Sequence, residues 1–204
     1  MQTSQSQSHN WNNTLLQHFY THALPGICYL LVAGFSLDLL AIHPSEASAV
    51  WPAAGISITA ILLRGYRACI GLFITLMLFY ANSWLDLTSI TSTVRSMTLM
   101  VLLSSAAIFQ AAAAVWLVRK FQGRMPALID DKQITLFLII IGPLASLVAS
   151  IVAITSFLAF GVIALEDFFI NWLTWWIGDS IGAMVVTPML LALLAGQDST
   201  LCNR

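Results

Sequence analysis

Asp179 is a carboxylic acid in the middle of an apolar run. It lies about 11 residues, or roughly 16 Å at helical rise, into the last run at 168–194. A carboxylate near the centre of a bilayer costs about 2.5–3.5 kcal/mol on insertion scales. The side chain is therefore expected to face protein or water rather than lipid. Two interpretations have equal weight, a polar site that is reached from outside and a structural carboxylate that is paired across helices.

The residues around Asp179 suggest what such a site would contain. Gly178 and Gly182 form a small-residue pair that permits close approach of another helix. Asp38, near the end of the first apolar run, and Trp51, at the start of the second, are expected at a similar depth. The predicted ligand-binding residues are Asp179, Trp51, Trp175, Trp176 and Asp38.

Other reactive residue types form no convincing site. His18 and His22 have the i, i+4 spacing of a metal clamp, but no third ligand is nearby, so an interfacial pair is the better interpretation. The cysteines, which are Cys28, Cys69 and Cys202, are best explained as small packing residues. No protease, hydrolase or phosphate-loop motif occurs in the sequence. We expect no catalytic residue, no metal and no cofactor.

Composition defines the elements that must position Asp179. Hydrophobic residues make up 59% of the chain and charged residues 8%, whereas a soluble domain is about a quarter charged. This predicts an all-α, polytopic transmembrane bundle of about six spans that needs the lipid bilayer as its partner. The net charge of −1 argues against a nucleic-acid partner. The expected spans are 25–42, 47–63, 66–85, 94–118, 133–160 and 168–194.

Basic residues predict the orientation of these spans. If six spans alternate, every Lys and Arg except Arg95 falls on one side, which should be cytoplasmic. Both termini would then be inside, and 43–47, 86–93 and 161–167 would face outward. The expected organisation is a polar tail with an interfacial helix (1–24), a transmembrane domain (25–195) and a cytoplasmic tail (196–204). In the fifth span, Gly142, Ser146 and Ser150 recur every four residues, which indicates close helix packing.

Two segments together resemble a known family. They are VWPAAGI at 50–56 and WWIGDSIG at 175–182, the latter followed by VVTP at 185–188. Their order and separation are similar to the membrane-associated sensor domain family, type one (the MASE family). The motif positions here are Trp51, Pro52, Gly55, Gly178, Asp179, Gly182 and Pro188.

The resemblance implies a non-enzymatic, N-terminal sensory module of bacterial histidine kinases and diguanylate cyclases, including two-component systems. Such a module would lie in the cell inner membrane as a multi-pass protein, and its output domain would be cytoplasmic. Family domains have more spans than are expected here, so the chain would be the larger part of one. The module could bind a small-molecule ligand or a membrane-protein partner, and it could form a homodimer. The alternative functions are a small-molecule transporter or permease and a membrane docking subunit.

Overall fold

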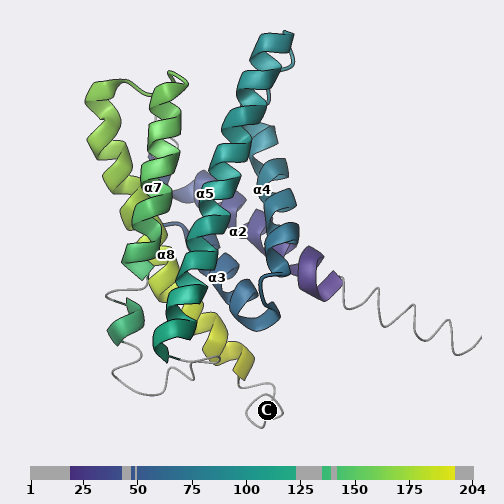
Figure 1. Ribbon diagram of the computed structural model, residues 1–204, viewed down its shortest axis with the longest axis vertical. Helices are drawn as coiled ribbons and strands as arrows, with labels where there is room; N and C mark the ends of the chain where they lie inside the picture. Colours follow the sequence, from purple (N-terminus) through teal and green to yellow (C-terminus); the bar gives the residue numbers. More distant parts are fainter. Residues whose placement is uncertain (1–18, 43–46, 49, 123–134, 139–141, 196–204) are drawn as a thin grey trace, which may run out of the picture.

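The computed structural model is a helical bundle (Figure 1), and it describes residues 19–42, 47–48, 50–122, 135–138 and 142–195. The elements are η1 (Phe19–Ala23), α2 (Leu24–Leu40), β1 (Ala41–Ile42), β2 (Ala47–Ser48), α3 (Pro52–Arg64), α4 (Ala68–Trp84), α5 (Ile90–Gln122), α7 (Gly142–Ala159), η3 (Leu165–Asp167) and α8 (Phe168–Ala195). The predicted all-α membrane bundle is confirmed, apart from one very short antiparallel strand pair, in which Ala41 faces Ser48 and Ile42 faces Ala47.

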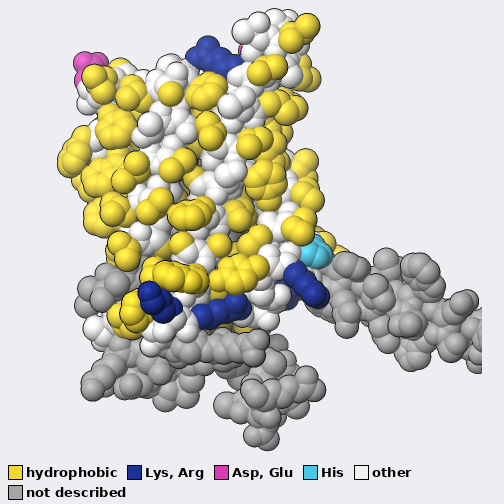
Figure 2. Space-filling view, in the orientation of Figure 1, with side chains coloured by type: hydrophobic (Ala, Val, Ile, Leu, Met, Phe, Trp, Pro, Cys, Tyr) yellow, Lys and Arg dark blue, Asp and Glu magenta, His cyan; other side chains and the backbone are white. Residues whose placement is uncertain are grey.

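The outer surface of the bundle is apolar. On α4, Ile70, Ile74 and Leu78 recur every four residues and are each more than half exposed, which is the pattern of a helix face that meets lipid. Hydrophobic side chains cover most of the middle of the face shown in Figure 2. Within the described residues, the helical stretches at 90–121, 142–159 and 165–194 are long and apolar enough to cross a membrane, while α3 and α4 are shorter apolar helices. The six-span count stays a prediction.

Two predicted span boundaries are wrong. The second span was expected from residue 47, but Ala47 pairs with Ile42 in the strand pair and α3 begins only at Pro52. Proline favours the first turn of a helix because its missing N–H would have no helical partner there. The fourth span was expected at 94–118, but α5 runs from residue 90 to residue 122. Its last turn therefore includes Arg119 and Lys120, which lie beyond the expected end of the span. Basic side chains in the last turn of a helix complement the helix dipole.

Some predicted elements fall partly outside the described residues. Only the end of the expected interfacial helix lies among the described residues, where it forms the π-helix η1 that continues directly into α2. The fifth predicted span is described at residues 135–138 and in α7, which begins at Gly142. His18 and Cys202 lie outside the described residues.

The small-residue stripe of α7 packs as predicted. Gly142, Ser146 and Ser150 are all buried, and α7 packs against both α5 and α8 (Figure 1). A hydrogen bond links two of these helices, because Gln110 Nε2 of α5 donates to Ser146 Oγ at 2.9 Å. The stripe therefore allows α7 to carry a polar contact into the centre of the bundle.

Basic residues of the described chain gather at one end of the bundle, where α3 and α5 end and α4 begins (Figures 1 and 2). Arg119 Nη2 donates to Ile61 O at 3.5 Å, and its guanidinium lies over the Tyr66 ring at 5.1 Å. Arg95, at the start of α5, instead donates to the carbonyl of Phe160, just after α7. This arrangement agrees with the predicted separation of charge, while which end is cytoplasmic stays a prediction.

Candidate functional site

The beginning of α3 lies directly against the middle of α8. The backbone N–H of Trp51 donates to Gly178 O at 2.9 Å. A Cβ added at Gly182 would overlap the carbonyl group of Trp51, and one added at Gly55 would lie 2.6 Å from Gly182 O. Both glycines are buried. Their missing side chains therefore allow the two backbones to touch.

A threonine extends the same contact by one turn. Thr187 is fully buried in α8, and its hydroxyl donates to Gly55 O at 3.3 Å. Thr59 Oγ1 donates to the same carbonyl at 2.8 Å. Pro188 follows inside α8, and because proline has no N–H, the carbonyl of Met184 loses its normal helical partner. The α3–α8 contact is thus tight at Gly182 and is followed by a weakened turn.

A cavity opens beside this contact, in the centre of the bundle. The space not filled by atoms, including its open mouth, is about 920 Å³. Side chains from α2, α3, α4, α5, α7 and α8 line it, together with Ser48 of β2. Every long helix of the described chain therefore contributes side chains to this one site.

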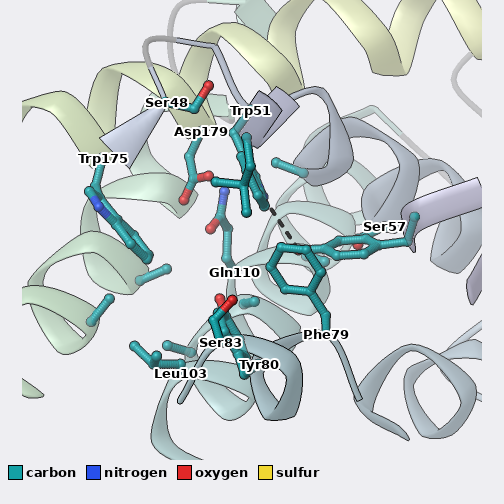
Figure 3. A pocket seen from close by; sticks show the side chains of 18 of the residues that line it. Ser48, Trp51, Ser57, Phe79, Tyr80, Ser83, Leu103, Gln110, Trp175 and Asp179 are labelled. Carbon is teal, nitrogen blue, oxygen red and sulfur yellow. Dashed lines mark hydrogen bonds between the residues drawn. The ribbon is translucent and has the colours of Figure 1, made fainter. Parts of the chain in front are cut away.

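Aromatic rings form much of the cavity wall (Figure 3). On one side, the Phe79 ring lies edge-on to the rings of Trp51 and Tyr29, with distances between ring centroids of 6.0 Å and 6.3 Å. Trp51 Nε1 also donates a hydrogen bond to Tyr29 Oη at 3.3 Å. On another side of the cavity, the Phe157 ring packs against the rings of Trp84 and Trp175, with centroid distances of 5.3 Å and 5.4 Å. These contacts hold the rings in place around the open space.

Asp179 projects from α8 into this aromatic cavity (Figure 3). Gln110 of α5 points its side-chain nitrogen toward the Asp179 carboxyl group and interacts with it. Gln110 is buried and also donates to Ser146, so its amide bridges α7 and α8 from α5. Asp179 is the single Asp, Glu, Lys, Arg or His among the described residues that line the cavity.

The structure brings three of the five predicted site residues together. Asp179, Trp51 and Trp175 line the cavity. Trp176 does not, since its ring stacks on Trp172 at 5.9 Å and its indole N–H donates to Pro143 O. It instead anchors α8 to α7.

Asp38 is exposed and does not line the cavity, contrary to the expectation that it lies near Asp179. The reason is helix geometry. The core-facing residues of α2 include Tyr29, Ala33 and Ser36, and at about 100° per residue Asp38 lies about 180° round the helix from Tyr29. Depth in the membrane was therefore a poor guide to proximity.

Gln110 and Tyr29 are cavity residues that sequence reasoning missed. Gln110 could have been found by the argument applied to Asp179, since it is a polar side chain inside an apolar run. Tyr29 left no comparable signal, because its ring is mostly apolar and fits an apolar run. Among the described residues, no three His, Cys, Asp or Glu side chains lie close enough together to hold a metal ion. Cys28 and Cys69 are free thiols.

The comparison with protein families matches these observations. A family model for MASE1 domains covers residues 22–200, more than half of the 204 residues. The chain belongs to the MASE1 family. This is a membrane-associated sensor domain family, so the resemblance seen in the two sequence segments is confirmed. Comparison with the curated proteins and with the solved structures gave no match. In this MASE1 domain, the two segments that carry the resemblance contact each other at Trp51 and Gly178.

Proposed function

We propose that this MASE1 domain is the sensory input part of a bacterial signalling protein, multi-pass in the inner membrane. A small ligand enters the central cavity and changes the packing of α3 on α8. The domain itself is not an enzyme. The last helix of the described chain, α8, passes the change to a cytoplasmic output domain that follows it in the full-length protein, such as a histidine kinase or a diguanylate cyclase.

One observation carries this proposal, namely that Trp51 belongs to both the cavity and the helix contact. Its indole ring lines the cavity and bonds Tyr29, while its backbone N–H bonds Gly178 of α8. A ligand that displaces the ring therefore pulls on the start of α3. Because the Trp51 N–H is bonded to Gly178 O and the two backbones touch at Gly182, a shift of Trp51 is passed to α8.

Energetics set the size of the expected effect. A ligand biases a bundle only as far as its affinity differs between two packings. Coupling of about 1–3 kcal/mol is typical between two sites of a protein, and rearranging a few backbone and threonine contacts at Gly55 and Gly178 is of this order. Packed helices switch between discrete arrangements, so small shifts suffice.

The test uses the full-length protein with its output domain in cells. Asp179→Asn should change output activity at equal membrane abundance, because the carboxyl group at the cavity is lost. Asp38→Asn is the matched control, since it removes a carboxylate of the same bundle that is exposed outside the cavity. Equal output from the wild type and Asp179→Asn would contradict the proposal. Asp179-dependent solute uptake in reconstituted vesicles, with unchanged output, would support a transporter instead.

A further inference from the structure

The described lining of the cavity holds one acidic side chain and no basic one. Asp179 supplies a carboxylic acid group, and no basic side chain is found among the described lining residues. Arg119 and Arg95 are engaged at opposite ends of the bundle, with the carbonyls of Ile61 and Phe160. The group that interacts with Asp179 from α5 is the uncharged amide of Gln110. The ionised form of Asp179 favours a partner of opposite sign, because the desolvation of a buried carboxylate is offset only by pairing and hydrogen bonding.

The aromatic walls of the cavity also favour a positively charged ligand. The rings of Trp51, Phe79, Tyr80 and Trp175 line the same cavity as Asp179 (Figure 3). Trp84 also lines it. Aromatic faces are negative and attract cations, which is how aromatic cages bind ammonium groups. Hydroxyl oxygens of Tyr29 and Ser83 on the lining can also accept hydrogen bonds from an N–H group. An anion would find no basic side chain on the described lining, where the donors are neutral groups such as the buried, unpartnered indole N–H of Trp175.

We infer that the cavity binds a small organic cation, a primary or quaternary ammonium compound with an apolar body. Its ammonium group would lie against Asp179, and its apolar part against the aromatic walls. A bare metal ion fits less well, because the described lining offers a single carboxyl group and metal sites of hard cations gather several oxygen ligands. The inference names the ligand class of the proposed function and depends on the cavity being the ligand site.

The test measures binding to the purified full-length protein in lipid nanodiscs by titration calorimetry. The probes are 2-phenylethylammonium, its uncharged analogue 2-phenylethanol and its anionic analogue 3-phenylpropanoate, with choline as the quaternary probe. At least one ammonium probe should bind, and 2-phenylethylammonium should bind more tightly than its two analogues. Asp179→Asn should weaken ammonium binding about 10- to 100-fold, the range for a hydrogen bond to a charged group, whereas Asp38→Asn should leave it unchanged.

A second variant covers the case in which Asp179→Asn does not fold. Phe79→Leu keeps an apolar side chain but removes a π-face from the wall. It should weaken ammonium binding about 2- to 10-fold and change the binding of 2-phenylethanol much less.

Each remaining outcome bears on the inference. Equal binding of 2-phenylethanol and 2-phenylethylammonium would overturn the cationic class while leaving the cavity as a ligand site. Ammonium binding that both Asp179→Asn and Phe79→Leu leave intact, or no binding of any ammonium probe, would also overturn it. The proposed function fails separately, through unchanged output of the Asp179→Asn protein in cells.

Discussion

The backbone N–H of Trp51 is bonded to the carbonyl of Gly178 at 2.9 Å, which joins the first turn of α3 to the middle of α8. Both partners are backbone groups, so the bond depends on how closely the helices approach rather than on a particular side chain. The approach in turn depends on the glycines beside it. This contact therefore gives the two family segments a shared physical role, which is to hold two helices at backbone distance next to the cavity.

Gly182→Ala should destabilise the domain by about 1–3 kcal/mol, the usual cost of forcing extra volume into a packed site. The new Cβ would overlap the Trp51 carbonyl, a backbone group that cannot rotate away. Thermal unfolding in detergent measures the loss. Gly34→Ala is the matched control, because a Cβ there meets nothing within 4 Å and alanine favours a helix over glycine by up to about 1 kcal/mol. Equal stability of the two variants would show that the α3–α8 contact can relax.

Ser146→Ala should destabilise the bundle by about 0.6 kcal/mol and by at most about 1.7, as measured for polar contacts between membrane helices. The change removes the acceptor of the 2.9 Å hydrogen bond from the buried Gln110 amide. It should also loosen Gln110 at the cavity. Unfolding of the variant is compared with that of Ser105→Ala, which changes an exposed serine of α5. A loss in Ser146→Ala no larger than that in Ser105→Ala would contradict a structural role for the Gln110–Ser146 bond.

The turn before α5 should weaken in acid. The pKa of Asp86 is lowered from its ordinary value, first because Thr88 Oγ1 donates to the carboxylate and then because the Thr88 N–H does so. A lowered pKa in the folded state means that this contribution to stability is present above the pKa of the unfolded chain, 3.8. It is lost as pH falls through the lower folded value.

Carbon-detected NMR titration of the Asp86 carboxyl group measures this effect. In Thr88→Ala its pKa should move back toward 3.8, because the hydroxyl donor is gone. Exchange protection of the Thr88 amide should fall over the same acidic range in the wild type. An Asp86 carboxyl group that titrates identically in both proteins would contradict the assigned cause.

Topology is predicted from the basic residues, with residue 122 cytoplasmic and residue 89 outside. Single cysteines at Gln122 and Ser89, in a background without native cysteines, are treated in whole cells with a membrane-impermeant thiol reagent. Labelling is expected at 89, which is exposed in the turn before α5, and not at 122. Permeabilised cells should label both positions and so control for reactivity. Labelling of 122 alone in whole cells would reverse the orientation.

The sequence by itself determined the class of the protein. Hydropathy is summed residue by residue, so 59% hydrophobic and 8% charged residues are enough to predict membrane helices without any contact. The same reasoning kept Asp179 away from lipid, and the small-residue spacing of α7 correctly predicted close packing. The two segments around Trp51 and Gly178 identified the family before their contact was known.

Only the tertiary structure decided which residues share a site. Asp38 and Trp176 had suitable chemistry, yet Asp38 lies on the exposed side of α2 and Trp176 packs on α7. Gln110 joined the site from α5, far away in sequence. The physical reason is that hydropathy predicts how deep a residue lies, whereas its neighbours depend on the rotation of each helix. That rotation is set by contacts between distant segments, such as Gly182 beneath the Trp51 carbonyl.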